Sequence, residues 1–189
     1  MLKQAEQVLY KRVTWSDFSA MHGGFSSESG GGAKHVSLST SMRAEIADFF
    51  QLEDPGQQNE VEHAIELEQI EDIPNSGGPM TVTYEVRGSD RAEWRIPDQQ
   101  ENRYVLWDQP WFPAGNSWNQ EEYRADDTTP IIYFIRDAES MFHARALGTA
   151  SEENLQKFPR IIRCEWRDAI ESYYRRNNCG IVNLSGGVT

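Results

Sequence analysis

One short segment of the sequence alternates acidic residues with mostly apolar ones, with a period of two. In residues 60–68, Val61, Ile65 and Leu67 fall on one side of an extended chain. The intervening glutamates fall on the other side: Glu60, Glu62, Glu66 and Glu68. Successive side chains of a strand point to opposite faces, so the pattern predicts a β-strand. Because a row of glutamates must stay hydrated, one face of the sheet that contains this strand has to be wet.

Further short strands are predicted along the rest of the chain from alternating or β-branched residues. They are Val8–Val13, Lys34–Ser39, Thr81–Arg87, Ala92–Ile96 and Arg103–Trp107, and a hairpin of Ile131–Arg136 with Met141–Ala146. Residues 4–10 also tolerate a helix. The strands do not alternate with helices as in a parallel α/β fold, so we expect a mainly β fold with a few helices, as an antiparallel barrel or sandwich.

Three helices are expected beside these strands. The first is Met42–Phe50, with Ser39, Thr40 and Ser41 as a choice of N-caps and Pro55-Gly56 as the stop. The second opens at Ser151-Glu152-Glu153 and stops near Pro159. The third follows Ile162, Trp166, Ile170 and Tyr173 on one face and ends near residues 177–180, where Gly180 is typical of a helix stop.

The size and composition favour one folded domain over residues 1–189. Six Trp, seven Tyr and eight Phe supply the large apolar groups that a disordered chain lacks. The two cysteines, Cys164 and Cys179, form no disulfide framework, and we expect both to be structural. Residues 1–6 lack an apolar signal-peptide core, and no stretch has the length of a membrane span. We therefore expect a cytoplasmic protein with no membrane contact.

The net charge of −12 is unfavourable for nucleic-acid binding at first sight, but it is unevenly distributed. Residues 44–80 contain ten acidic residues and no Lys or Arg. Arginines outnumber lysines fourteen to four, and arginine suits bidentate contacts to phosphate and guanine. A solvated acidic face on an ordinary cytosolic protein explains the charge equally well.

No catalytic constellation is recognisable. The four histidines are scattered, without the spacing of a metal site: His22, His35, His63 and His143. None of the four lysines follows an acid in the D/ExK pattern of metal-dependent nucleases, and there is no GxSxG motif. The triple glycine Gly30-Gly31-Gly32 is followed by Ala33-Lys34-His35, which is not a phosphate loop. The glycine-rich residues 14–33 form either a flexible arm that approaches a ligand or a plain surface loop.

Three segments carry a resemblance to a known family. Tyr10-Lys11-Arg12 leads into the glycine-rich stretch, which ends in Gly31–Leu38. Gln100–Trp107 is a polar and basic approach to a tryptophan, and the hairpin Ile131–Ala146 is followed by the acidic residues 149–153. In order and spacing over about residues 8–160, they resemble the N-terminal effector DNA-binding domain of EcoRII-like type IIE restriction endonucleases. That domain is a pseudobarrel of the kind also found in plant transcription factors, the "B-three" fold.

The resemblance implies an antiparallel DNA-binding pseudobarrel that reads the major groove of double-stranded DNA with two arms. The first arm would be about Thr14–His35, and the second would lie within about Arg87–Arg103. The implied DNA-binding residues are Lys11, Arg12, Ser16, Asp17, His22, Lys34, His35, Arg87, Arg91, Arg95, Asn102 and Arg103. Arginine can bond both O6 and N7 of guanine, aspartate accepts from cytosine, and asparagine pairs with adenine. Lys11, Arg12 and hydroxyl groups would hold phosphates.

In that family, cleavage belongs to a separate catalytic domain. We therefore expect a non-catalytic recognition module of a longer restriction endonuclease, with no cofactor of its own and Mg²⁺ only in the separate nuclease domain. The sequence departs from the family pattern by a longer first arm and by acids within the second: Asp90, Glu93, Asp98 and Glu101. Two alternatives stay open. One is an acidic protein-interaction or inhibitor domain that uses residues 44–80, and the other is a small nuclease that uses His22, His35 or His143.

Overall fold

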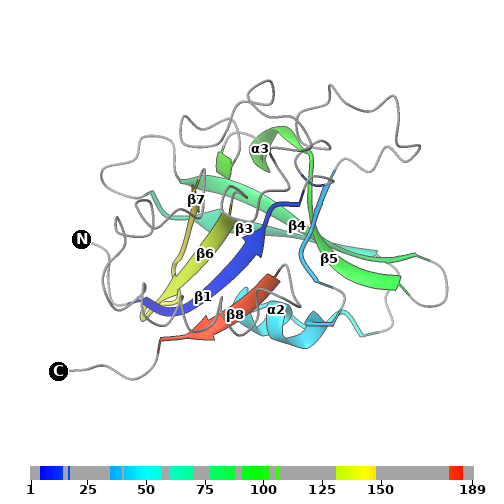
Figure 1. The fold of residues 1–189 in the computed structure, drawn as a ribbon, viewed down its shortest axis with the longest axis horizontal. Helices are drawn as coiled ribbons and strands as arrows, with labels where there is room; N and C mark the ends of the chain where they lie inside the picture. Colours follow the sequence, from blue (N-terminus) through cyan, green and yellow to red (C-terminus); the bar gives the residue numbers. More distant parts are fainter. Residues whose placement is uncertain are drawn as a thin grey trace.

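The computed structural model describes residues 5–14, 17, 35–39, 41–56, 60–69, 77–87, 91–102, 105–106, 131–147 and 179–184. These residues form one eight-stranded sheet in the order β2-β5-β4-β3-β7-β6-β1-β8. The strands are β1 (Ala5–Arg12), β2 (His35–Ser37), β3 (Glu60–Leu67), β4 (Gly78–Arg87), β5 (Arg91–Pro97), β6 (Ile131–Asp137), β7 (Phe142–Leu147) and β8 (Cys179–Asn183). The sheet curls into a half-barrel (Figure 1). The prediction of a mainly β, pseudobarrel-like fold with few helices is confirmed.

Strand pairing is antiparallel throughout the described sheet, except where β3 meets β7. There, Leu67 at the end of β3 pairs in parallel with Phe142 at the start of β7. The amide of Glu68 then donates to the Phe142 carbonyl at 2.7 Å. This contact joins the two halves of the sheet, β2-β5-β4-β3 and β7-β6-β1-β8.

The alternation within residues 60–68 has the predicted outcome. Ile65 and Leu67 are buried, whereas Glu60, Glu62 and Glu66 are exposed on the other face of β3. β4 lies directly beside β3, with Val61 opposite Tyr84 and the other pairs in continuous register. One face of this half of the sheet is therefore the core, and the other is wet along β3, as the glutamate row requires.

The main core lies on the inner face of the curled sheet, where α2 (Arg43–Phe49) packs against it (Figure 1). Ile46, Phe49 and Phe50 are buried there, and the Phe50 ring packs edge-on against Phe134 of β6 at 5.6 Å. The indole nitrogen of Trp94 on β5 donates to the Arg43 carbonyl at 3.0 Å. This bond fixes the helix to the sheet and satisfies the one polar atom of a fully buried tryptophan.

The expected termini of the α2 helix are wrong in detail. Met42 occupies the N-cap without a side-chain capping bond, while Ser39 and Ser41 bond to each other instead. The helix ends at Phe49, well before Pro55, because Gln51 adopts a positive φ of 56°. Packing of the apolar face, rather than a serine cap or a proline stop, sets the length of this helix.

Two further expectations are corrected. Val105 and Leu106 lie buried in a helical turn after α3 (Gln100–Asn102), so the predicted strand Arg103–Trp107 is wrong at these two residues. The glycine at 180 ends no helix, since Cys179 and Gly180 open strand β8. The predicted helices at 151–159 and 162–177 lie outside the described residues. Neither described helix has the length and apolar character needed to cross a bilayer.

Gly180 is required by close packing between strands rather than by a helix end. It pairs with Tyr10 across β1 and β8, and the tyrosine ring lies over its Cα. A Cβ added at Gly180 would lie 2.6 Å from both Cε1 and Cζ of Tyr10. An aromatic ring that covers a glycine in this way shields the backbone of a strand that has no side chain of its own.

We expect Gly180→Ala to lower the free energy of unfolding by about 2 kcal/mol, because the new methyl group overlaps a buried ring. Chemical denaturation of the purified variant measures this. In a Tyr10→Ala background the same substitution should cost much less, since the overlap is gone. An equal cost in both backgrounds would contradict the packing described here.

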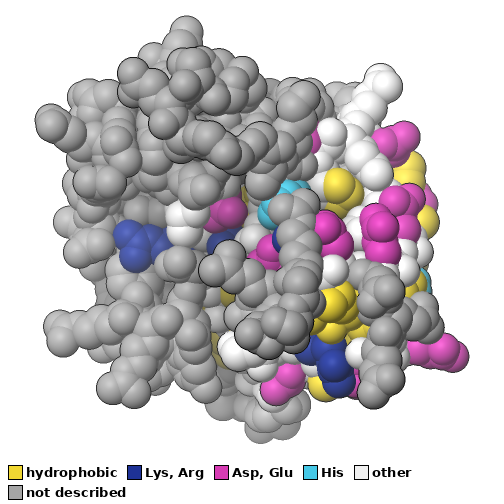
Figure 2. All heavy atoms as spheres, turned by 90° about the vertical axis from the view of Figure 1, so that its right-hand side faces the viewer, with side chains coloured by type: hydrophobic (Ala, Val, Ile, Leu, Met, Phe, Trp, Pro, Cys, Tyr) yellow, Lys and Arg dark blue, Asp and Glu magenta, His cyan; other side chains and the backbone are white. Residues whose placement is uncertain are grey.

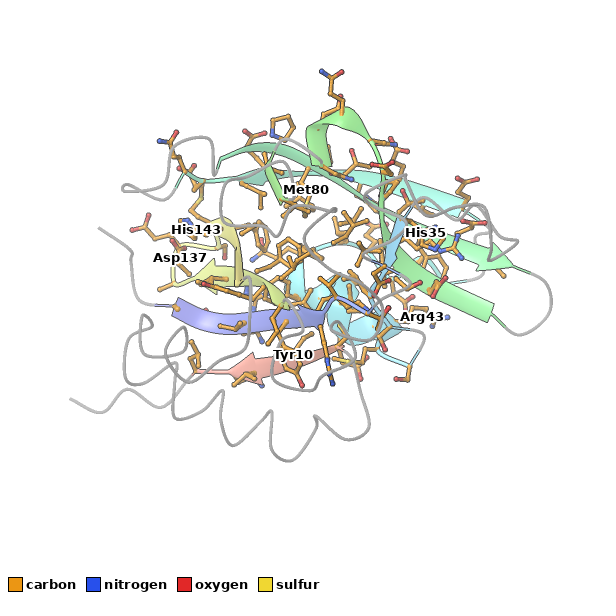
Figure 3. The ribbon with its side chains drawn as sticks, turned by 45° about the horizontal axis from the view of Figure 1, so that its top comes forward. Tyr10, His35, Arg43, Met80, Asp137 and His143 are labelled. Atoms are coloured by element: carbon orange, nitrogen blue, oxygen red, sulfur yellow. The ribbon has the colours of Figure 1, made fainter. Side chains whose placement is uncertain are left out.

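The β6–β7 hairpin, predicted from the sequence, is confirmed, and one aspartate organises its turn. Asp137 Oδ1 accepts from the amides of Glu139 and Met141 at 2.9 and 3.0 Å. Its Oδ2 lies 3.1 Å from Nε2 of His143, which is buried on β7 (Figure 3). Burial raises the pKa of Asp137, but the hydrogen bonds from Met141, His143 and Glu139 outweigh it and hold the pKa below its ordinary value of 3.8.

This arrangement predicts acid sensitivity. Because the pKa of Asp137 is lower in the folded state than in the unfolded state, its stabilising effect is present above pH 3.8 and is lost as pH falls further. Denaturation between pH 2 and 6 should show a shallower acid loss of stability for Asp137→Asn than for the wild type. Glu66→Gln, which removes an exposed carboxylate, is the matched control and should retain the wild-type slope.

Candidate nucleic-acid interface

Four strands begin or end side by side at one edge of the sheet. Arg12 at the end of β1 pairs with Ile131 at the start of β6, and Ile131 pairs with Leu147 at the end of β7. Lys11 pairs with Cys179, the first residue of β8. The pairing therefore brings together residues from β1, β6, β7 and β8 that flank the longest connections of the chain.

The ends of β2 and β5 reach the same edge. His35 pairs with Pro97, so the start of β2 lies beside the end of β5. Asp17 joins this pair of strands to β1, because its carboxylate lies 3.2 Å from Lys11 Nζ and accepts from the Ser37 amide at 3.4 Å. We call this meeting point of strand ends the arm edge.

Three long connections have both of their described ends at the arm edge. Residues 13–34 join β1 to β2, residues 98–130 follow β5 and precede β6, and residues 148–178 join β7 to β8. By contrast, the β6–β7 turn at the far end of the hairpin takes only residues 138–141. Binding segments of β folds are commonly long connections mounted on a rigid sheet, so the arm edge is the candidate interface.

A continuous chain of polar contacts crosses the sheet from Asp17, and we call it the polar junction. Ser37 Oγ donates to Glu93 Oε2 at 2.9 Å. Arg95 then donates to Glu93 through Nε and a terminal nitrogen, at 2.8 and 2.6 Å, and its other terminal nitrogen bonds Glu85. Arg95 is 5% exposed, so these two glutamates satisfy a nearly buried guanidinium.

The charge state of Glu93 follows from these contacts. Burial raises its pKa, but bonds from Arg95 and Ser37, together with the charges of Arg95 and His35, lower it below the ordinary glutamate value. His35 Nε2 lies 3.9 Å from the Glu93 carboxylate. Glu93 is therefore ionised at neutral pH and belongs to the protein's own ion pairs.

The face of the sheet that carries the polar junction is acidic. Glu60, Glu85 and Glu93 are direct cross-strand neighbours on β3, β4 and β5. Acidic side chains predominate over basic ones on the described part of this side of the molecule (Figure 2). Like charges opposite one another repel, and Arg95 offsets this for two of the three glutamates. This face would also repel phosphates, so a duplex would have to approach from the arm edge.

Asn102 does not have the exposure that a base contact needs. It is fully buried as the last residue of α3, and its side chain bonds to backbone groups of the described residues. Its oxygen accepts from the Thr81 amide at 2.7 Å, and its nitrogen donates to the carbonyls of Thr81 and Pro97 at 2.9 and 2.8 Å. Asn102 thus connects the backbone of Thr81 on β4 to that of Pro97 at the end of β5, and we assign it a structural role.

The described cations of the predicted site are likewise engaged within the protein. Lys11 pairs with Asp17, both of them buried, and Arg95 pairs with two glutamates. Arg12 is half-buried at the end of β1 and also interacts with the protein. His35 stands at the arm edge, as Figure 3 shows at the start of β2. Four described lysine and arginine side chains bond another group of the protein: Lys11, Arg43, Arg95 and Arg136.

The two predicted arms differ in where they start relative to the arm edge. Arg87 and Arg91 face each other at the β4–β5 turn, whereas Pro97 at the other end of β5 adjoins His35. Six strand residues at about 3.3 Å each separate the turn from the arm edge by about 20 Å. Only the later part of the second arm, after Pro97, starts beside the first arm. Ser16, His22, Lys34 and Arg103 lie outside the described residues, as do the side chains of Arg87 and Arg91.

Three residues of the polar junction were not predicted as site residues: Ser37, Glu85 and Glu93. A partial signal was present, because Glu93 and Arg95 are two apart on one strand and must share a face. The partner glutamate on β4 depends on the register between strands, which local sequence does not specify.

The described part of the chain holds no group of three His, Cys, Asp or Glu side chains placed to bind a metal ion. Burial raises the pKa of the Cys179 thiol to about 12, and the nearby charges of Lys11 and Asp17 act in opposite directions on it. The thiol is therefore protonated at neutral pH, as expected of a structural cysteine.

Comparison with known proteins gives no match. Neither a protein-family model, nor a curated protein, nor a solved structure is similar to this chain.

Proposed function

We propose that this chain is a sequence-specific double-stranded DNA recognition domain of a restriction endonuclease, which reads the major groove with two arms from the arm edge. The first arm is about Thr14–His35. The second is the part of the predicted Arg87–Arg103 arm that follows Pro97. We also propose that it works in the cytoplasm, beside a separate nuclease domain.

The observation that carries the proposal is the meeting of the two arm roots. His35 and Pro97 are paired, and Asp17 connects that pair to Lys11 on β1. Two polypeptide segments that start from one rigid edge can enter one groove together, whereas segments at opposite ends of a strand would be about 20 Å apart. The resemblance to the EcoRII-like effector domain, noted from the sequence, agrees with this placement.

The residues proposed to contact DNA are the arm residues to which no structural role has been assigned. Among the residues predicted from the sequence, these are Ser16, His22, Lys34, His35 and Arg103. Lys34 directly precedes the arm edge and Arg103 directly follows Asn102. Cations at these positions would neutralise phosphates or bond guanine edges.

Binding to a duplex selected from a random library tests the proposal. We expect Lys34→Glu and Arg103→Glu each to weaken binding at least tenfold, because reversing a charge at a phosphate contact adds repulsion. Arg91→Glu makes the same charge change at the distant β4–β5 turn and should leave affinity within about twofold. If Arg91→Glu weakened binding as much as the other two, the arm edge would not be the interface.

We further propose that this domain does not cut DNA and needs no cofactor, and that Mg²⁺ serves only a separate catalytic domain. Supercoiled plasmid incubated with the purified chain and Mg²⁺ or Mn²⁺ should remain supercoiled. Nicking that persists through purification would support instead a small nuclease of unrecognised type.

A second candidate function is docking of a basic protein partner on the acidic face. The observation in its favour is that Glu60, Glu62 and Glu66 are exposed on one face of β3. The triple variant Glu60→Gln/Glu62→Gln/Glu66→Gln separates the candidates. It should bind the selected duplex at least as tightly as the wild type if DNA is the ligand, since it removes only repulsion. It should lose a basic protein partner if that is the ligand.

A further inference from the structure

The Asp17 carboxylate contacts groups at both ends of the first arm. Its Oδ2 accepts from the Thr14 amide and hydroxyl at 2.9 and 2.7 Å, and lies 3.2 Å from Lys11 Nζ. Its Oδ1 accepts from the Ser37 amide, 20 positions later in the chain. One buried carboxylate thus holds the start of the arm and the strand that follows it.

Ser37 links Asp17 to β5. While its amide donates to Asp17, its hydroxyl donates to Glu93 at 2.9 Å, and Glu93 is bonded in turn to Arg95. Pro97 lies two residues beyond Arg95, at the root of the second arm. The polar junction is therefore an unbroken path of polar contacts from the root of the first arm to Arg95, two residues from the root of the second.

Buried polar paths of this kind favour one relative position of the parts they join, because a displaced member leaves a buried polar group unpaired. We infer that Asp17 and Ser37 are positioning residues, which fix the position of the first arm relative to the second for DNA binding without touching DNA themselves. Lys11 serves the same role as the counter-ion of Asp17. This inference rests on the proposed function, and it replaces the sequence-based expectation that Lys11 and Asp17 contact DNA directly.

Ser37→Ala tests the path most cleanly, because it removes only the hydroxyl and leaves the Asp17–Lys11 pair intact. We expect affinity for the selected duplex to fall about fivefold, the equivalent of one lost hydrogen bond, while the melting temperature stays within a few degrees. Ser37→Thr keeps a hydroxyl and should restore the affinity. Ser39→Ala is the matched control, since among the described residues that hydroxyl bonds only with Ser41, and it should bind as the wild type does.

The salt dependence of binding separates positioning from direct contact. The double variant Lys11→Met/Asp17→Asn removes both buried charges together, which avoids leaving either of them unpaired. It should weaken binding with an unchanged slope of log affinity against log salt. If Lys11 held a phosphate, the slope would shrink by about 0.9.

The outcomes distinguish the two proposals. If the wild type binds a selected duplex and both Ser37→Ala and the double variant bind equally well, the positioning role is overturned and the DNA-binding function stands. A reduced salt slope in the double variant overturns the positioning role in favour of a direct contact by Lys11. If the wild type binds no duplex, the proposed function fails and this role fails with it.

Discussion

Replacing Asn102 by aspartate will lower the free energy of unfolding by about 3–5 kcal/mol, one of the largest effects expected in this protein from the exchange of a single heavy atom. The variant keeps the shape of the side chain but turns its donating nitrogen into an oxygen. That oxygen would face the carbonyls of Thr81 and Pro97 at distances of 2.9 and 2.8 Å, in a fully buried site. Denaturant titration at pH 7 measures the loss.

Gln100→Ala provides the control for Asn102→Asp, because Gln100 is exposed in the same short helix. It should change stability by less than about 0.5 kcal/mol. A stable Asn102→Asp protein with impaired DNA binding would contradict the structural role assigned here. It would restore the sequence-based expectation that Asn102 reads a base.

The second large effect is expected at Arg95. In Arg95→Met, the side chain that neutralises Glu85 and Glu93 is gone, and two partly buried carboxylates face each other beside Glu60. We expect a loss of about 3 kcal/mol, as for other ion pairs broken by removal of one buried partner. Stability should recover partly as the solution is acidified toward pH 4, because protonation of the glutamates relieves their repulsion.

A compensating variant tests the cause of the Arg95→Met effect. Adding Glu85→Gln and Glu93→Gln removes the unpaired charges, and the triple variant should regain more than half of the lost stability. If it stayed as unstable as Arg95→Met, the arginine would stabilise the sheet through packing of its aliphatic stem rather than through its ion pairs.

Much of the fold follows from local sequence, because the strands have strong period-two patterns. β3, β4, β5 and the β6–β7 hairpin appear where alternation places apolar side chains on one face. The errors occur where local signals compete with tertiary contacts. Val105 and Leu106 have strand-forming character but are buried in a helical turn, and Gly180 has the character of a helix stop but serves the packing of Tyr10.

The candidate site was less predictable from sequence for a physical reason. The local sequence around a lysine or arginine on a strand is the same whether its side chain faces a ligand or a neighbouring carboxylate. Arg95 and Lys11 were expected to bind DNA, yet their partners Glu85 and Asp17 come from separate elements that only the folded register brings close. Amphipathic periodicity predicts which face is buried, but the pairing of charges across strands depends on tertiary structure.

Selection from a random duplex library, in methylated and unmethylated pools, is the decisive test of DNA recognition by this protein. We expect enrichment of one defined sequence motif, with an affinity for that duplex that falls steeply as salt rises from about 50 to 200 mM. Charge reversal at Lys34 or Arg103 should abolish the enrichment while circular dichroism shows the fold intact. No enriched motif in either pool, and no duplex binding at the lower salt concentration, would contradict the claim that this protein recognises DNA.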